Sequence, residues 1–191
     1  MIKCAGNCTF YLFKKGGIIL RFKGKIITPG VAYAKVYHVG IESYKLYRDS
    51  IKPETVEIEI RKFKDAVKVV LDELIRVHDI TVNCYGLQNY RSIENQIKFL
   101  SSKQLIDSVA EKIAYDCIHA DLALKYVAKD HKNEIFKKEF DGYLDVIQDI
   151  KYACASVYDQ LHEVRKQELQ YINEEVILVA DEITPIQMAL I

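Results

Sequence analysis

The stretch EEVILVADEITP, residues 174–185, decides the fold of this chain. Its centre, residues 176–180, is a continuous apolar run with acidic residues on both sides. Such a run is typical of a strand that is buried on both faces. Pro185 closes the segment, because proline cannot donate a backbone hydrogen bond to a sheet. A strand buried in this way needs neighbouring strands, so the rest of the sequence must supply partners for it.

A second strand segment is GKIITPGVAYAKVYHV, residues 24–39. It predicts two short strands around a turn at Pro29 and Gly30. Along residues 31–39 both alternating sets of side chains are largely apolar, which indicates a strand covered on two sides. Two such strands are too few to bury the run at 176–180. We therefore expect most of the sheet to lie outside this chain.

Two apolar seams of helical spacing lie between these strands. After Pro53, which suits the first turn of a helix, the spacing predicts a helix of about 25 residues. Its seam is Ile60, Phe63, Val67, Val70, Leu74 and Val77. A second seam with the same steps of three and four is Ile147, Ile150, Cys154, Val157, Leu161 and Val164. The two seams predict a long antiparallel helix pair packed through these positions.

Shorter helices are predicted between the two seams. One covers residues 92–100, and the next begins at residue 101 with a capping box of Ser101 and Gln104. A third begins near His119 and ends before Asp141. The predicted fold class is α+β and mostly helical, with an antiparallel helical bundle or hairpin between the first and last strands.

The composition excludes several classes of function. Lys plus Arg and Asp plus Glu number 27 each, and this balance argues against nucleic acid as a partner. No apolar window reaches the length of a membrane span. The five cysteines are scattered, and Cys4 and Cys8 have no further ligands nearby, so we expect neither a disulfide framework nor a metal site. Cys154 falls on the second seam and is expected to be a core residue. These features favour a protein of the cytoplasm.

Two motifs resemble enzyme I of the bacterial phosphoenolpyruvate-dependent sugar phosphotransferase system. ITPGVAYAKVY, residues 27–37, resembles the opening of that family, and EEVILVADEITP resembles its strand after a helical insertion. The order and separation of the two motifs also fit, and the resemblance covers about residues 22–191. It implies a helical subdomain that docks the phosphocarrier protein HPr, inserted into a truncated phosphohistidine α/β domain.

The resemblance also implies what this chain lacks. The phosphorylated histidine of the family lies some twenty residues beyond the Thr-Pro motif, and the barrel that binds phosphoenolpyruvate and Mg²⁺ follows later. Neither is present, so we expect no catalytic residue, no cofactor and no metal in this chain. None of its five histidines lies in a phosphohistidine-like sequence, and no orienting partner for any of them is evident from the sequence. We expect a monomer that does not transfer phosphate by itself.

The predicted HPr-binding residues lie in IENQIKFLSSKQLIDSV, residues 93–109. This segment resembles a helix–break–helix of the family in which a Phe-Glu-Gly/Ala-His motif precedes a Leu-rich run and an acidic cluster. Residues 101–104 replace the acidic cluster with neutral and basic groups, which should weaken the encounter with the basic rim of an ordinary HPr. For Phe99 and Leu105, filling the core is an equally good interpretation. The predicted contact residues are Glu94, Gln96, Lys98, Phe99 and Leu105.

A second departure from the family lies near residue 148. Gln148 and Asp149 stand where the family has Arg-Asp, and no arginine occurs between Arg91 and Arg165. A phosphate clamp would therefore be missing or rebuilt from Lys138 or Lys151. A lysine keeps the charge but loses the bidentate fork of arginine.

The predicted domains are a leader at 1–21, first strands at 22–50, a helical HPr-binding subdomain at 51–170 and a returning strand at 171–191.

Three interpretations of the chain remain open from the sequence. The chain is the N-terminal part of an enzyme I-like phosphotransferase for sugar uptake, or a stand-alone interaction module that acts as a regulator or decoy. The third interpretation is a gene remnant with an exposed, aggregation-prone strand.

Overall fold

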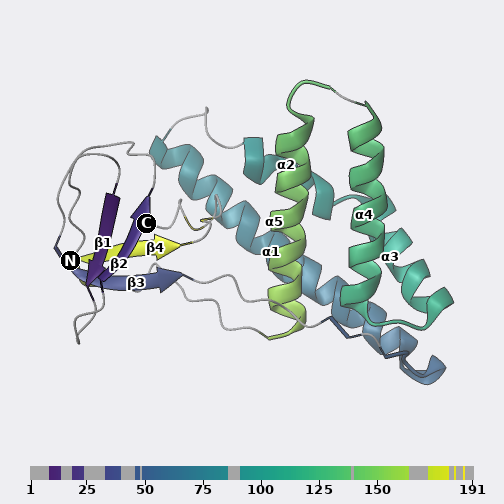
Figure 1. The fold of residues 1–191 in the computed structure, drawn as a ribbon. Helices are drawn as coiled ribbons and strands as arrows, with labels where there is room; N and C mark the ends of the chain where they lie inside the picture. The colour runs from purple at the N-terminus through teal and green to yellow at the C-terminus, as the bar shows by residue number, and fades with distance from the viewer. Residues whose placement is uncertain are drawn as a thin grey trace. The chain divides into compact units, whose positions relative to one another are not determined.

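The computed structural model describes residues 9–13, 19–23, 33–39, 46–47, 49–85, 91–138, 140–163 and 172–180, together with residues 183 and 187. The described residues fall into two compact units. One lies within Met1–Ile41 and Glu168–Ile183, and the other within Glu42–Gln167 and Thr184–Ile191. Figure 1 shows strands in the first unit and helices in the second.

The strand unit contains two pairs of strands. β1 (Thr9–Phe13) and β2 (Ile19–Lys23) form an antiparallel hairpin, with Thr9 opposite Lys23 and Phe13 opposite Ile19. β3 (Lys35–Val39) pairs in parallel with β4 (Val176–Ala180). The predicted strand at 176–180 is confirmed with the same limits. The hairpin lies where the sequence suggested only an unmatched leader, and the predicted turn at Pro29 and Gly30 lies outside the described residues.

The β3–β4 pair joins distant parts of the chain. Lys35 is opposite Val176, and Val39 is opposite Ala180. At the start of the pair the Lys35 ammonium lies 2.6 Å from a carboxylate oxygen of Glu174. Both side chains are mostly exposed, so this ion pair adds little stability. The pairing is important because it brings the two motifs that flank the helices together in one sheet.

The helical unit begins with a short 3-10 turn, η1 (Pro53–Thr55), with proline at its first position. The long helix α1 (Val56–Tyr85) follows directly. After it come α2 (Arg91–Leu100), α3 (Lys103–Asp116), α4 (Ala120–Lys138) and α5 (Tyr143–Leu161). The described residues therefore contain five α-helices, and the molecule is mostly helical, as the sequence predicted.

The core of the described residues lies wholly within the helical unit. α1 buries the predicted seam from Phe63 to Val77, and α5 buries Ile150, Cys154 and Val157. Helices α2, α3 and α4 add further apolar side chains to the same cluster. Among the largest fully buried side chains are Phe63, Leu74, Ile93, Leu100, Ile113, Leu124 and Ile150.

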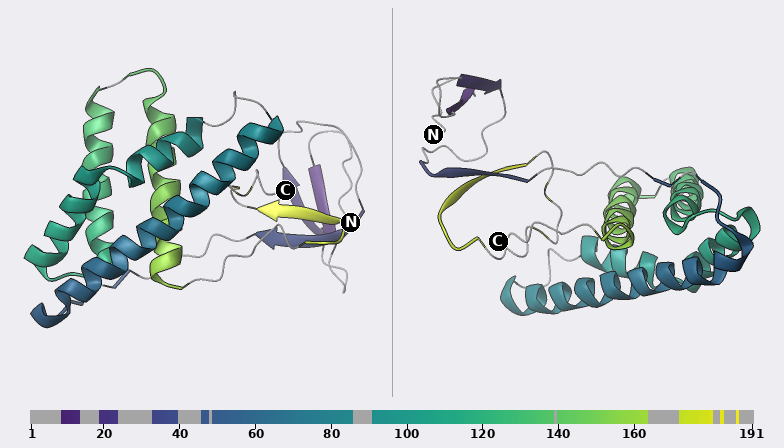
Figure 2. Two further views of the ribbon diagram at one scale, coloured as in Figure 1. Left: turned by 180° about the vertical axis from the view of Figure 1, so that it is seen from behind. Right: turned by 90° about the horizontal axis from the view of Figure 1, so that it is seen from below.

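The predicted pairing of the two seams differs from the structure. α4 and α5 lie side by side as an antiparallel hairpin, and α1 crosses beneath them at a steep angle (Figures 1 and 2). Helix α5 packs mainly against α2 and α4, and less against α1. Val164, the last position of the second seam, lies outside the described residues. The two seams thus meet in one core without running along each other.

The start of α3 also differs by one residue from the prediction. The cap is Ser102, whose hydroxyl accepts a hydrogen bond from the backbone N–H of Leu105 at 3.5 Å. Ser101 lies outside the helix, and its hydroxyl donates to the carbonyl of Lys98. Among the described helices, none is long and apolar enough to cross a membrane.

Candidate docking surface

Helix α2 presents one buried and one exposed face. Side chains spaced by three and four residues turn inward, as in an amphipathic helix: Ile93, Gln96, Phe99 and Leu100. The opposite face exposes Arg91, Glu94 and Lys98, which we name the α2 ridge. These three side chains share one stripe because they too are spaced by three and four residues.

The five predicted contact residues divide between these two faces. Glu94 and Lys98 are exposed and belong to the α2 ridge. Gln96 is fully buried, Phe99 is 6% exposed and Leu105 is 5% exposed. Side chains with so little free surface offer almost nothing to a partner, so we assign these three to the interior of the helical unit. For Phe99 and Leu105 this was the alternative interpretation of the sequence.

A buried polar network joins α2 to α5. Asp149 of α5 is 4% exposed, and one of its carboxylate oxygens accepts a hydrogen bond from the hydroxyl of Ser92. The other oxygen accepts from the side-chain amide of Asn95 at 2.7 Å. Gln96 donates to the Ser92 hydroxyl at 3.4 Å, while its own carbonyl oxygen has no partner among the described residues. We call Ser92, Asn95, Gln96 and Asp149 the Asp149 network.

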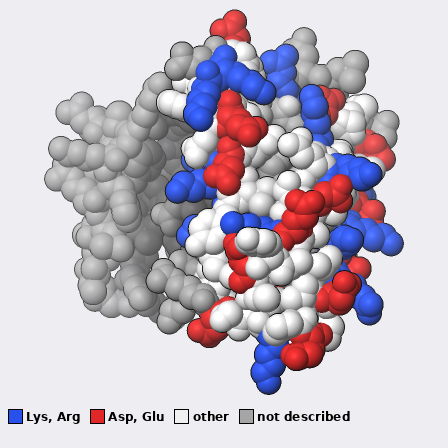
Figure 3. Space-filling view, turned by 90° about the vertical axis from the view of Figure 1, so that its right-hand side faces the viewer, with Lys and Arg blue, Asp and Glu red and all other residues white. Residues whose placement is uncertain are grey.

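Helix α1 contacts the α2 ridge through His78, which lies beside Glu94. Nε2 of His78 lies 3.6 Å from Glu94 Oε1, and Nδ1 of His78 lies 3.5 Å from Asp79 Oδ1. Both contacts become ion pairs only when the imidazole is protonated. The ridge therefore combines two cations with one carboxylate that faces a histidine. Figure 3 shows a similar mixture of basic and acidic side chains over one face of the helical unit.

Exposed apolar side chains gather at the turn between α4 and α5. Phe136 and Phe140 both contact the ring of Tyr143 edge-on, with ring centroids 5.8 Å and 6.4 Å apart. Phe136 is 53% exposed, Phe140 is 44% exposed and Leu144 is 60% exposed. We call these four residues the aromatic cluster. Grouped apolar side chains on a surface often mark a site of protein interaction.

The helix that begins at the aromatic cluster also packs against α2, on the buried side of α2. That helix is α5, and the Phe99 ring of α2 lies 5.5 Å from the His131 ring of α4. The two lysines that could rebuild a phosphate clamp lie on these same helices. Lys138 is exposed in the last turn of α4, and the ammonium of Lys151 donates to Gln148 at 3.2 Å. Whether either lysine meets a phosphate stays a prediction.

The histidines at the other end of the unit have partners that the sequence did not reveal. His119 Nδ1 lies 3.2 Å from Glu59 Oε1, and this oxygen also accepts the backbone N–H of Ala120 at 3.0 Å. His162 Nε2 lies 3.1 Å from Asp121 Oδ2, which also accepts the backbone N–H of Tyr47 at 3.0 Å.

The Tyr47 ring lies between the two imidazoles, with centroid distances of 5.0 Å and 5.2 Å. We call these residues the carboxylate–histidine cluster. Its partners are 41 to 74 residues apart in sequence, so no local motif could have predicted it. Asp121 binds the backbone at Tyr47, and Glu59 binds the backbone at Ala120, the first residue of α4. We therefore assign the cluster a structural role.

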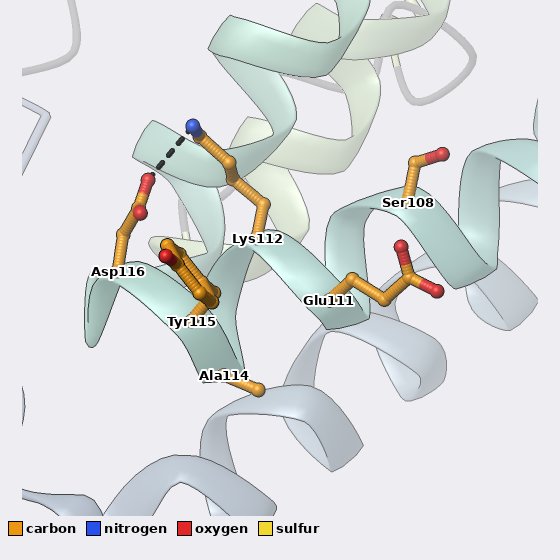
Figure 4. A pocket seen from close by; sticks show the side chains of 6 residues that line it. All are labelled: Ser108, Glu111, Lys112, Ala114, Tyr115 and Asp116. Carbon is orange, nitrogen blue, oxygen red and sulfur yellow. Dashed lines mark ion pairs between the residues drawn. The ribbon is translucent and has the colours of Figure 1, made fainter.

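A shallow cavity of about 620 Å³ lies on α3 (Figure 4). The ammonium of Lys112 pairs with Asp116 at 2.8 Å and lies 5.6 Å from the centre of the Tyr126 ring. The hydrogen bond that the Lys112 ammonium donates to Asp116 raises the pKa of Lys112. All the residues that line this cavity come from one helix: Ser108, Glu111, Lys112, Ala114, Tyr115 and Asp116. An active site usually combines groups from several elements, so we do not regard this cavity as catalytic.

Within the part of the chain that the structure describes, no three His, Cys, Asp or Glu side chains are placed to hold a metal ion. The clearest functional features are therefore surface features: the α2 ridge and the aromatic cluster, both supported by α5. An arrangement of this kind suits binding of another protein.

Residues 23–145 match the family described as PEP-utilising enzyme, N-terminal. The chain belongs to this family. It is 25% identical over 163 residues to the phosphoenolpyruvate-protein phosphotransferase of Bacillus subtilis. It is 26% identical over 164 residues to the protein of the same name from Staphylococcus epidermidis. Each alignment covers 85% of this chain and 28% of the relative, so the chain spans less than a third of the relatives' length.

A solved structure supports the same assignment for the fold. The chain matches the NMR solution structure of Enzyme I (nEIt) with a TM-score of 0.75, at 23% identity. The match covers 85% of this chain and 66% of that chain. The family match, the named relatives and this likeness of fold together confirm the predicted resemblance to the N-terminal part of enzyme I.

Proposed function

We propose that this chain docks the phosphocarrier protein HPr for an enzyme I-like phosphotransferase that serves sugar uptake in the cytoplasm. The contact surface in this proposal is the α2 ridge, with Glu94 and Lys98 as contact residues, together with the aromatic cluster. Gln96, Phe99 and Leu105 support the ridge from below. The chain binds as a monomer, and the phosphohistidine and the phosphoenolpyruvate-binding barrel with its Mg²⁺ are supplied by polypeptide other than residues 1–191.

The observation that carries this proposal is the pairing of a charged ridge with exposed aromatic side chains on helices of an enzyme I-like domain. Protein interfaces commonly combine an apolar centre, rich in aromatic side chains, with a polar rim. The parallel pairing of β3 with β4 supports the further proposal that the helical unit is an insertion between two strands of a phosphohistidine domain.

A titration of the isotopically labelled chain with HPr from the same organism tests this proposal. Backbone amide shifts are expected at residues 91–104 and around Phe136 and Phe140. Phe140→Ser is expected to weaken binding about tenfold, because an aromatic contact at an interface centre contributes on the order of 1–2 kcal/mol. A folded chain that shows no shifts at millimolar HPr would contradict the docking role.

Charge reversal on the α2 ridge gives a second test of the same surface. Lys98→Glu is expected to tighten binding to an HPr with a basic rim by several-fold, mainly through the association rate. The gain should shrink as salt is added, because exposed charges are screened. The matched control is Lys62→Glu on the exposed side of α1, which should change neither the affinity nor its dependence on salt.

The second candidate function is a non-catalytic interaction module. It is favoured by the neutral and basic side chains at 101–104 and by Gln148, which stands where the family has arginine. The intact mass of the native product separates the two candidates. A product much longer than 191 residues supports the phosphotransferase, whereas a native chain of 191 residues that binds a partner supports the module.

A further inference from the structure

Asp149 is a buried carboxylate whose hydrogen bonds, within the part of the chain that the structure describes, all come from neutral groups of α2. It is 4% exposed, and its two oxygens accept from Ser92 and Asn95 of α2. Burying a carboxylate without a cation costs free energy, and a pair of apolar side chains would often serve stability as well. The carboxylate therefore calls for an explanation other than added stability.

The geometry of the two donors supplies that explanation. Ser92 and Asn95 are three residues apart in the first half of α2, so both lie on the side that faces α5. Two hydrogen bonds to one fixed carboxylate define how far α2 is rotated about its own axis. A helix of ten residues is too short to be stable alone, so its orientation depends on such tertiary contacts.

In the Asp149 network, Gln96 donates a hydrogen bond to Ser92, and Ser92 in turn donates one to Asp149. An ionised carboxylate only accepts, so the Ser92 hydroxyl donates to Asp149 and must itself accept from Gln96. Gln96 uses its amide N–H for this bond, and its carbonyl oxygen stays without a partner among the described residues. The buried glutamine thus orients the serine hydroxyl toward the carboxylate.

We propose that Asp149 is the positioning residue of the docking surface, because it fixes the rotation of α2 that brings Arg91, Glu94 and Lys98 to the outside. This inference rests on the proposed docking of HPr, and Asp149 itself is too buried to contact a partner. A rotation of α2 by one residue, about 100°, would turn the ridge away and expose apolar side chains. The effect of Asp149 on binding is therefore exerted through α2.

Hydrogen exchange of the full chain tests this directly, without any partner. In Asp149→Ala, the amides of residues 95–100 should exchange at least about tenfold faster, because two hydrogen bonds to a charged group are lost. Asp149→Asn keeps the shape and the bond from Ser92 but places two amide groups together at Asn95, so an intermediate effect is expected. The matched control is Asp145→Ala, which removes an exposed carboxylate from the first turn of α5 and should leave α2 unchanged.

The decisive variant is a double substitution that swaps the side chains of residues 95 and 149. Asn95→Asp combined with Asp149→Asn restores a donor opposite an acceptor, and it should return both α2 exchange and HPr affinity to near the values of the unmodified chain. In Asp149→Ala the affinity for HPr should fall about tenfold.

The exchange and binding measurements test different parts of the proposal. Unchanged exchange of α2 in Asp149→Ala would overturn the proposal, whatever happens to binding. Faster exchange with unchanged HPr affinity would overturn the link to docking. If the unmodified chain does not bind HPr, the proposed function fails, and the exchange data still decide whether Asp149 holds α2.

Discussion

Cys154 lies in the middle of α5 on the side that faces the core, between Ile150 and Val157. Its side chain is 5% exposed, and burial raises the pKa of its thiol from 9.0 to about 12, because a buried thiolate cannot be hydrated. The charge of Lys132 opposes this effect but is the smaller influence. Burial also raises the pKa of the neighbouring Tyr158 hydroxyl. The fold thus keeps a potentially reactive thiol protonated.

The raised pKa of Cys154 predicts a loss of stability in alkali. The unfolded thiol ionises near pH 9.0 while the folded thiol stays protonated to about pH 12. The folded state therefore binds the proton more tightly, and this contribution to stability is full below pH 9.0 and disappears as the pH rises toward about 12. Between pH 9 and pH 11, the free energy of unfolding should fall about 2 kcal/mol more in the unmodified chain than in Cys154→Ala.

Urea unfolding at a series of pH values measures this difference. Cys117→Ala serves as the control, because Cys117 is only half-buried and should behave like the unmodified chain. Parallel curves for the unmodified chain and Cys154→Ala would show that the thiol is ionised or solvated in the folded state.

The sequence predicted the role of some residues well and of others not at all. Cys154 was placed in the core because it falls on an apolar seam with helical spacing, and that prediction is confirmed. The partners of His119 and His162 could not be predicted, since Glu59 and Asp121 are distant in sequence and only the packing of three helices brings them together. Local patterns determine which residues turn inward, and long-range contacts determine which polar groups meet.

At the start of helix α3, the sequence pattern and the structure favour different residues as the N-cap. Ser101 and Ser102 both precede the helix, and a Ser with Gln104 three residues later favoured Ser101. In the structure the extended residue is Ser102, with φ −65° and ψ 119°, and its hydroxyl faces the N–H of Leu105. The N–H group that Ser102 caps is that of Leu105, which is only 5% exposed, so the helix begins just before its first buried apolar side chain.

Removing each serine in turn should separate the two candidates for the cap. Ser102→Ala is expected to lower the free energy of unfolding by about 1 kcal/mol, because a free N–H group loses its acceptor at the helix start. Ser101→Ala should change it by less than about 0.5 kcal/mol. Chemical denaturation of both variants checks this. A larger loss for Ser101→Ala would restore the capping box of Ser101 and Gln104.

The helix boundaries and the helix pairing differ in how far the sequence determines them. The predicted starts of α2 and α4 agree with the structure to within about one residue, because start signals and apolar spacing are local features. The steep crossing of α1 and α5 was not predicted. A seam of threes and fours shows which face of a helix is buried, but many crossing angles bury the same face.

The described residues divide into a helical unit, which contains the described core, and a strand unit. Every buried apolar side chain of the described core lies between Phe63 and Val157. The sequence predicted strands before and after a mostly helical block, while the β1–β2 hairpin was missed. Five-residue strands carry too little periodicity to be distinguished from a short apolar run.

This division predicts that the helical unit folds by itself. A fragment of residues 42–167 should keep its helical circular dichroism signal and unfold in one cooperative transition, because it retains the entire described core. The full chain is the control and should show the same midpoint to within a few degrees. A fragment that unfolds gradually, without a transition, would show that the helices depend on the strand unit.

The carboxylate–histidine cluster also has a consequence for transfer of the helical unit into another protein. Tyr47 near its beginning and His162 near its end bind the same oxygen of Asp121. A segment whose two ends meet needs only a small gap in a recipient protein, so it can be spliced into a surface loop without stretching the surrounding chain. We therefore expect residues 46–163 to keep their helical fold when they are inserted into a surface loop of an unrelated host.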